Sequence, residues 1–284
     1  MKTKIFLDSG DPSETREAIK LLGFLDGQTT NPTLIAKNPD AASRLAKGEK
    51  FTEAEILDFY KKTVQEISGL IPKGSVSIEV YADNSTTADQ MLKQGREFFA
   101  WIPNAHIKYP TSVEGLKAAE ISVKEGIRVN MTLCFSQEQA AAVHAATKGA
   151  SMGQVFVSPF IGRLDDLGEN GMDLIKNIIK MYGEASSHVE VLTASVRSEE
   201  HVALALALGS DIITMPLKVL ENSKSQITNP KQIPISKFEL LNLKPIPYQE
   251  LDLSKPWQEL YQEHELTVKG MQKFSEDWNK LYDE

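Results

Sequence analysis

Ser75-Val76-Ser77-Ile78-Glu79-Val80-Tyr81 is the stretch that says most about the fold, because β-branched residues crowd into a short run around one acid. Near-continuous apolar runs of this kind are typical of parallel strands that are buried on both faces. Seven similar runs predict further strands near Lys4–Asp8, Phe24–Gln28, Phe98–Lys108, Ile127–Thr132, Gln154–Ser158, His188–Ala194 and Asp211–Thr214. Eight strands alternating with helix-like segments favour a parallel (β/α)8 TIM barrel, with an open doubly wound sheet as the alternative.

Capping residues mark the ends of the helices between these strands. Asp11 precedes Pro12, which predicts a capped helix start, and the segments 111–114 and 136–139 have the spacing of capping boxes. Left-handed glycines are expected where helices give way to strands, at Gly23, Gly126 and Gly209.

The 284 residues are long enough for one barrel, and we expect a single domain over 1–284. Two parts exceed a minimal barrel. A helical insertion is expected over about 38–73, and a C-terminal extension over about 222–284. The extension begins with an irregular stretch that carries five prolines over 222–256, and it ends in an amphipathic helix predicted near Trp257–Tyr282.

Composition excludes several classes of function. The net charge of −8 argues against bulk attraction to nucleic acid, and no apolar run approaches the roughly 20 residues that cross a bilayer. The single Cys134 excludes an internal disulfide framework, and five scattered histidines lack metal-ligand spacing. We therefore expect a cytoplasmic protein that binds no nucleic acid, membrane or metal.

Polar residues end the predicted strands, where a barrel collects its chemistry. Asp8 closes the first strand, Glu79 lies within the third, and Lys108 closes the fourth. Charged groups in buried strands are costly unless they are paired or functional. One lysine and two acids at such places therefore indicate a site.

A lysine enclosed by apolar walls and other cations loses proton affinity. The resulting amine can attack a ketone and form an imine, which stabilises a carbanion on the neighbouring carbon without a metal or organic cofactor. A carboxylate then moves the proton of the sugar hydroxyl. Two arginines, Arg163 and Arg197, could bind a phosphate in bidentate fashion.

Each candidate also has a simpler interpretation. Lys108 could be a rim lysine paired with Asp8 or Glu79, Asp8 could cap the next helix, and Glu79 could face solvent. The arginines could form ordinary surface salt bridges. Asn31, which precedes a proline, could be a turn or helix-entry residue.

At these residues the chain resembles the transaldolase family. Two long segments carry the resemblance, Phe6–Ser9 together with Asp26–Ile35, and Ile107–Ala118. Shorter similar segments are Asn130–Leu133, Val157–Arg163, Thr193–Arg197 and His264–Thr267. The resemblance implies a barrel enzyme of the pentose phosphate pathway that transfers a dihydroxyacetone unit from sedoheptulose 7-phosphate to glyceraldehyde 3-phosphate, giving erythrose 4-phosphate and fructose 6-phosphate.

The resemblance also implies a role for each matching residue. Lys108 corresponds to the imine-forming lysine, Asp8 to the acid/base of carbon–carbon cleavage, and Glu79 with Thr132 to the pair that positions water. Residues implied to bind the dihydroxyacetone hydroxyls are Asn31, Asn130 and Ser158. Residues implied to form the phosphate site are Arg163, Ser195 and Arg197, while Phe160 lines the pocket.

Two residues separate subgroups within this family. Related fructose-6-phosphate aldolases typically carry Gln where Glu79 stands and Tyr where Phe160 stands, so the resemblance favours a transferase over an aldolase. A non-catalytic phosphosugar-binding barrel is the third possibility. Tyr109 departs from the family pattern, which has a smaller aliphatic residue there. Phosphorylated sugars are the expected partners, and a homo-oligomer is possible.

Overall fold

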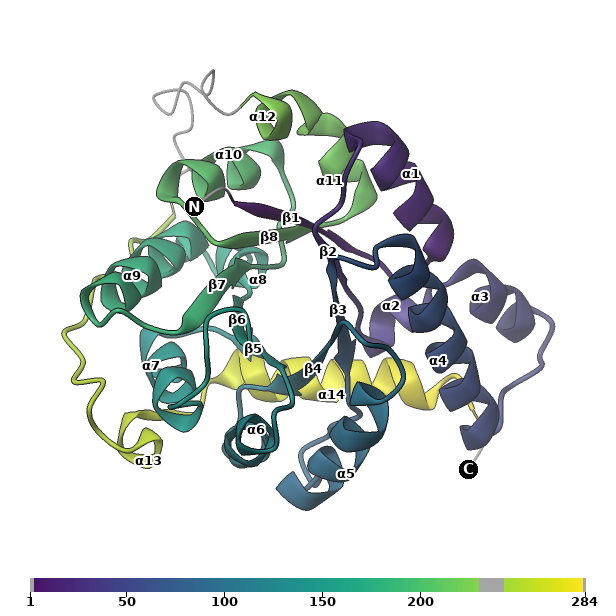
Figure 1. Ribbon diagram of the computed structural model, residues 1–284, viewed down its shortest axis with the longest axis horizontal. Helices are drawn as coiled ribbons and strands as arrows, with labels where there is room; N and C mark the ends of the chain where they lie inside the picture. The colour runs from purple at the N-terminus through teal and green to yellow at the C-terminus, as the bar shows by residue number, and fades with distance from the viewer. Residues whose placement is uncertain (1–2, 230–242, 283–284) are drawn as a thin grey trace.

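The computed structural model describes residues 3–229 and 243–282. Eight parallel strands follow one another in chain order, and the last pairs with the first, so the sheet closes into a barrel (Figure 1). The strands are β1 (Lys4–Asp8), β2 (Gly27–Thr29), β3 (Ser75–Glu79), β4 (Ala105–Pro110), β5 (Val129–Cys134), β6 (Val155–Pro159), β7 (Val189–Thr193) and β8 (Ile212–Met215). The predicted TIM barrel is confirmed, and the open-sheet alternative is wrong.

Helices surround the barrel and cover its outer face (Figure 1). They are α1 (Pro12–Leu22), α2 (Pro32–Ala36), α3 (Pro39–Ala46), α4 (Glu53–Leu70), α5 (Ala88–Phe99), α6 (Val113–Lys124), α7 (Gln137–Ala146), α8 (Ile161–Asp165), α9 (Gly171–Glu184), α10 (Glu199–Leu208), α11 (Leu217–Asn222), α12 (Lys224–Thr228), α13 (Trp257–Leu260) and α14 (Glu265–Asn279). Within the described residues, no helix is long and apolar enough to cross a membrane.

Two strand predictions were wrong at their N-terminal ends. Phe98 and Phe99 finish helix α5, and the fourth strand begins only at Ala105. An apolar pair on the buried face of a helix looks the same in sequence as the start of a buried strand. The second strand is likewise shorter than predicted and begins at Gly27 rather than Phe24.

The helix ends follow local hydrogen-bonding rules. Asp11 accepts from the amide of Ser13 and caps α1 as predicted, and Gly23, Gly126 and Gly209 all have positive φ. Neither predicted capping box forms. Ser112, one residue later than predicted, caps α6, and Ser136 caps α7 without a reciprocal bond from the side chain of Gln139.

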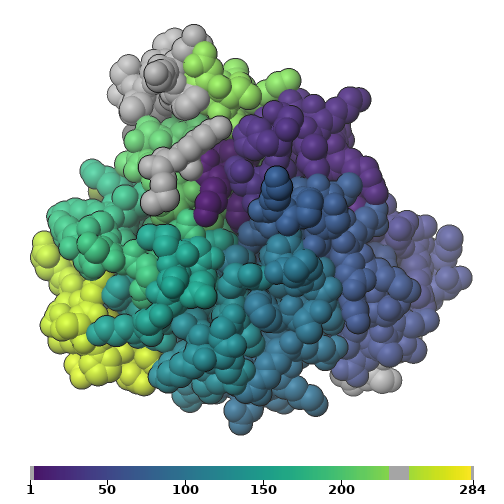
Figure 2. Space-filling model, viewed as in Figure 1, coloured from purple at the N-terminus to yellow at the C-terminus, as the bar shows by residue number. Residues whose placement is uncertain are grey.

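The parts beyond a minimal barrel are helical. The segment 38–73, predicted as an insertion, holds α3 and α4, but α4 packs against β3 and α1 as the regular helix between β2 and β3, so only α3 is added there. The predicted final helix is broken at 261–264, because His264 caps a second helix, α14, which packs against α2 and β5. The first piece, α13, packs beside α7 and appears as yellow atoms at the lower left of Figure 2. Pro230 and Pro234 of the predicted irregular stretch lie outside the described residues.

Alternation along the strands sets the interior of the barrel. Residues two apart in a strand point to the same face. Ser77 and Glu79 therefore face inward from β3, as do His106 and Lys108 from β4. Phe156 of β6 stacks on the His106 ring at 4.1 Å and helps to fill the N-terminal half of the barrel. The later residue of each pair, Glu79 or Lys108, lies at the C-terminal mouth.

Candidate active site

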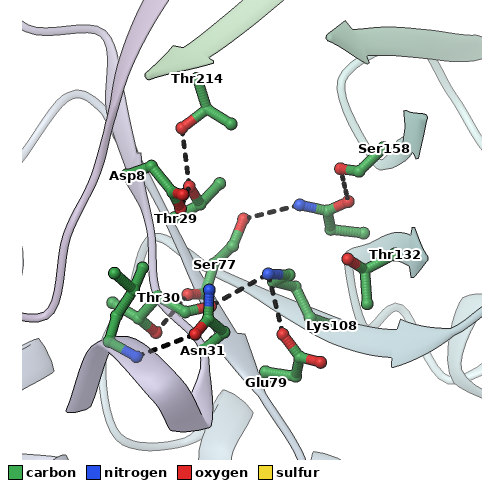
Figure 3. A network of polar contacts seen from close by, with 12 residues as sticks. Asp8, Thr29, Thr30, Asn31, Ser77, Glu79, Lys108, Thr132, Ser158 and Thr214 are labelled. Carbon is green, nitrogen blue, oxygen red and sulfur yellow. Dashed lines mark hydrogen bonds and ion pairs between the residues drawn. The ribbon is translucent and has the colours of Figure 1, made fainter. Parts of the chain in front are cut away.

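Lys108 is buried at the C-terminal mouth of the barrel, with 3% of its side chain exposed. Its register partner on β3 is Glu79, and the Lys108 Nζ lies 2.8 Å from the Glu79 carboxylate, which is 4% exposed. The Nζ also donates to the carbonyl oxygen of Thr30 at 3.1 Å (Figure 3). The lysine is thus held at two points, by Glu79 on β3 and by the residue that follows β2, and its ionic partner is one of the two acids that the simpler interpretation named.

Two carboxylic acids flank this lysine. Burial raises the pKa of Asp8, while the positive charge of Lys108 and a 2.6 Å hydrogen bond from the hydroxyl of Thr29 oppose that rise. Burial likewise raises the pKa of Glu79, again against the attraction of Lys108. Both acids therefore bind a proton more readily than exposed carboxyls do, which suits groups that give and take protons.

A chain of polar side chains crosses the barrel beside the lysine. The hydroxyl of Ser158 donates to the Asn130 side-chain oxygen at 2.6 Å, and the Asn130 amide donates to the hydroxyl of Ser77 at 3.1 Å (Figure 3). Asn130 is therefore held in one orientation. Next to it on β5, the buried Thr132 hydroxyl has no hydrogen-bond partner among the described residues. A water or substrate hydroxyl could complete it.

An irregular turn places Thr132. The next residue, Leu133, has a positive φ of 57°, and the β5–β6 register shifts between Met131 and Cys134. The hydroxyl of Thr267 on α14 donates to the Leu133 carbonyl at 2.8 Å. The C-terminal helix thus fixes the end of β5.

A cavity of about 270 Å³ opens above Lys108. Eight of the predicted site residues line it: Asp8, Asn31, Lys108, Ser158, Phe160, Arg163, Ser195 and Arg197. Three predicted residues, Glu79, Asn130 and Thr132, do not line this cavity. Glu79 instead lines a neighbouring hollow of about 460 Å³ together with Tyr60 and Trp278.

Two arginines border the cavity on the side of β6 and β7. The Arg163 guanidinium lies 5.3 Å from the Phe160 ring and 5.4 Å from that of Phe274 on α14, and burial lowers its pKa. A Cβ atom at Gly270 would lie 2.7 Å from Arg163 Nη1, so a side chain there would displace the arginine. Arg197 differs, because it forms a bidentate ion pair with Asp166 that raises its pKa.

Of the simpler interpretations of the site residues, the structure agrees with some and contradicts others. Asn31 does enter a helix, since its side-chain oxygen caps α2 by accepting from the amide of Leu34 at 2.9 Å. Asp8 is not a helix cap, because Asp11 caps α1, and Glu79 does not face solvent. Lys108 does pair with Glu79, but inside the barrel and not on its rim.

The structure also accounts for a departure from the family pattern. Tyr109 points away from the cavity, and its hydroxyl lies 3.0 Å from that of Ser122 on α6. A Cβ atom at Gly95 would collide with the Tyr109 hydroxyl, so glycine makes room for the larger ring. The tyrosine therefore changes the packing behind β4 and leaves the cavity lining alone.

The cavity has nine further lining residues that the sequence did not single out, among them Thr29, Lys37 and Phe274. Thr29 lies inside the recognised segment 26–35, so its place beside Asp8 could have been inferred. Nothing in the sequence places Phe274 there, since it comes from a helix that reaches the mouth only in the folded chain. Across residues 3–229 and 243–282, no three His, Cys, Asp or Glu side chains gather as a metal site would require.

Comparison with known proteins identifies the family of the chain. The family model described as Transaldolase/Fructose-6-phosphate aldolase matches residues 5–284. A protein named "Probable transaldolase" from Halalkalibacterium halodurans is 36% identical over 276 residues, covering 97% of this chain and 99% of that protein. One with the same name from Dehalococcoides mccartyi is 42% identical over 217 residues, covering 76% of this chain and 88% of its own length. A third from Myxococcus xanthus is 34% identical over 98% of this chain and 95% of that protein. The chain belongs to the transaldolase/fructose-6-phosphate aldolase family.

Proposed function

We propose that this protein is a transaldolase that moves a dihydroxyacetone unit from sedoheptulose 7-phosphate to glyceraldehyde 3-phosphate through an imine at Lys108. The observation that carries the proposal is the placement of one buried amine beside two buried carboxyls, next to a cavity bordered by two arginines. We further expect it to act in the cytoplasm.

The first step joins the lysine to the sugar. The Nζ attacks the ketose carbonyl carbon, and the carbonyl oxygen takes up a proton to give a carbinolamine. Glu79, 2.8 Å from the Nζ, can supply a proton as water leaves and the carbon–nitrogen double bond forms. The Thr132 hydroxyl, which lacks a partner, is suited to hold that water. The same groups act in reverse when the product imine is hydrolysed.

The second step breaks the carbon chain. Asp8 accepts the proton of the hydroxyl on the carbon that becomes the aldehyde, and the adjacent carbon–carbon bond breaks. Its electron pair moves into the protonated imine, which becomes a neutral enamine, and the first aldehyde leaves. The enamine then attacks the carbonyl of the acceptor aldehyde, and Asp8 returns the proton to the new hydroxyl. Atoms and charge balance without an organic cofactor or a metal.

Substrate binding follows from the cavity lining. Asn31 and Ser158 line the cavity and Asn130 is hydrogen-bonded to Ser158, so these residues are placed to bind the hydroxyls of the dihydroxyacetone unit. Arg163 and Arg197 are placed to bind the phosphate at the other end of the sugar, as guanidinium groups commonly do. Glu79 and Phe160 favour the transferase over the aldolase subgroup.

Borohydride trapping tests the proposal directly. The protein is incubated with sedoheptulose 7-phosphate and borohydride, which reduces an imine to a stable secondary amine, and the modified peptide is mapped by mass spectrometry. We expect one sugar-derived addition, at Lys108. Addition at another lysine, or none, would overturn the imine assignment and leave a non-catalytic sugar-binding barrel.

Acceptor dependence separates transferase from aldolase. With fructose 6-phosphate as donor, a transaldolase turns over only when an acceptor such as erythrose 4-phosphate is present. Release of free dihydroxyacetone without an acceptor, at a rate close to that of transfer, would assign the protein to the aldolases instead.

A further inference from the structure

The ladder between β2 and β3 is interrupted beside Lys108. The amide of Thr30 donates to the carbonyl of Ser77 at 3.1 Å, which is the last regular rung. In a parallel ladder the next rung would run from the amide of Glu79 to the carbonyl of Thr30. That rung is missing. The Glu79 amide instead donates to the hydroxyl of Tyr60 at 3.0 Å, and the Thr30 carbonyl accepts from Lys108 Nζ at 3.1 Å.

The direction of each hydrogen bond around Tyr60 follows from the number of protons available. The Thr30 hydroxyl has one proton, which it donates to the Ser77 carbonyl at 2.8 Å. In its 2.6 Å contact with Tyr60 the Thr30 hydroxyl must therefore accept. The Tyr60 hydroxyl thus accepts from Glu79 and donates to Thr30, so it serves both strands at once.

We propose that Tyr60 is a positioning residue for Lys108, because its hydroxyl takes the Glu79 amide out of the ladder and so leaves the Thr30 carbonyl for the lysine amine. The inference rests on the proposed function for its consequence, but its geometry does not depend on any substrate. Thr30 and Glu79 are the two residues that hold Nζ, and Tyr60 bonds to both of them. One hydroxyl thereby contacts both residues that fix the position of Nζ.

The surroundings of Tyr60 suit a fixed support. The residue is buried on α4, and its ring packs at about 6 Å from the rings of Phe98, Trp101 and Trp278, measured as 6.1, 5.9 and 5.8 Å. Trp278 belongs to α14. The regular helix between β2 and β3 and the added C-terminal helix thus meet on the residue that supports the lysine.

Reductive methylation of the whole protein tests this without any sugar. Formaldehyde with cyanoborohydride methylates accessible amines, and the rate at Lys108 is read by peptide mass spectrometry across a pH series. In Tyr60→Phe the Glu79 amide and Lys108 compete for the Thr30 carbonyl. We expect methylation of Lys108 about fivefold slower on its pH plateau, the size expected from one hydrogen bond. The pH midpoint should also move, whereas Lys37 in the same cavity reacts as before.

Tyr109→Phe is the matched control, because it removes another buried, hydrogen-bonded tyrosine hydroxyl from the other side of β4. We expect its Lys108 rate to stay within about twofold of wild type. Thr30→Val keeps Tyr60 but removes the hydroxyl that accepts its hydrogen bond. It should change the methylation rate of Lys108 in the same direction as Tyr60→Phe but by a smaller factor, and it replaces Tyr60→Phe if that variant does not fold. Equal rates and midpoints for Tyr60→Phe and Tyr109→Phe would overturn the proposal.

Sugar trapping in the same variants separates the two proposals. If wild type forms no sugar imine while methylation of Lys108 still depends on Tyr60, the proposed function fails and the positioning role stands. If wild type forms the imine and Tyr60→Phe forms it at the wild-type rate and midpoint, the positioning role fails and the function stands.

Discussion

Each end of the barrel holds a lysine paired with a glutamate, and the two pairs have different surroundings. At the C-terminal mouth, Lys108 and Glu79 lie 2.8 Å apart on adjacent strands, and both are almost fully buried. At the N-terminal end, Lys4 of β1 reaches past β8 to Glu190 of β7 at 2.7 Å, but 42% of the Lys4 side chain is exposed. The chemical groups are the same, so burial and neighbours decide what each pair can do.

A lysine in contact with water keeps its charge at little cost, and Lys4 therefore compensates a buried carboxylate and links β1 to β7. The second oxygen of Glu190 has no hydrogen-bond partner among the described residues. The mouth pair pays a larger desolvation penalty and has a second acid, Asp8, beside it. A buried lysine with two neighbouring acids is suited to proton transfer, whereas the N-terminal pair stabilises the fold.

Removing each lysine in turn gives the largest contrast. Lys108→Met should lower turnover by at least about a thousandfold, because the proposed imine cannot form without the Lys108 amine. Lys4→Met should leave turnover within about twofold, but lower the free energy of unfolding by roughly 1–3 kcal/mol, since Glu190 loses its partner. Steady-state assays and urea unfolding measure the two effects. Loss of turnover in folded Lys4→Met would abolish the distinction between the two ends.

Replacing an acid at each end gives the next contrast. Asp8→Asn should reduce turnover by about 10²–10⁴-fold, because the proton of the sugar hydroxyl has no acceptor. It should still form the imine, so borohydride trapping at Lys108 remains. Glu190→Gln is the control and should keep turnover. An Asp8→Asn variant that fails to trap sugar would show instead that Asp8 is needed for imine formation.

The sequence predicted the charged residues of the site better than the residues that helix packing brings to it. Lys108, Asp8 and Glu79 could be identified because a charge inside an apolar strand is conspicuous and strand ends meet at one mouth. The barrel followed from the alternation of strands and helices. Phe98 and Phe99 were misassigned because burial alone does not distinguish helix from strand. Phe274, Lys37 and Tyr60 were missed because their places depend on how helices dock, which no local pattern records.

Acid should act in opposite directions at the two ends. Burial lowers the pKa of His106, at the N-terminal end, to about 3 from 6.5. Between these pH values the unfolded chain binds a proton that the folded chain does not, so His106 makes stability fall as pH falls, by about 1.4 kcal/mol per pH unit. Asp8 and Glu79 have raised pKa values, so the folded chain binds their protons first, and their contribution is present at low pH and is lost as pH rises through those pKa values.

Urea unfolding from pH 4 to pH 8 can separate these contributions. His106→Gln should flatten the loss of stability below about pH 6.5. Glu79→Gln should instead reduce the fall in the free energy of unfolding that begins as pH rises above the ordinary carboxyl pKa. Parallel stability curves for His106→Gln and wild type would mean that His106 is not buried neutral.

A third ion pair distinguishes the effect of position in the barrel from the effect of burial. Arg197 and Asp166 lie at the C-terminal mouth, as Lys108 and Glu79 do, but they are largely exposed. Exposed pairs contribute little to stability, roughly 0–1 kcal/mol, so Asp166→Asn should hardly change unfolding. It should lower the KM for a phosphorylated donor about threefold, because a phosphate no longer meets a carboxylate on the same guanidinium. The gain should shrink as salt is added, since exposed charges are screened. An increased KM would show that Asp166 is needed to orient Arg197, and that even an exposed pair at the mouth serves the site.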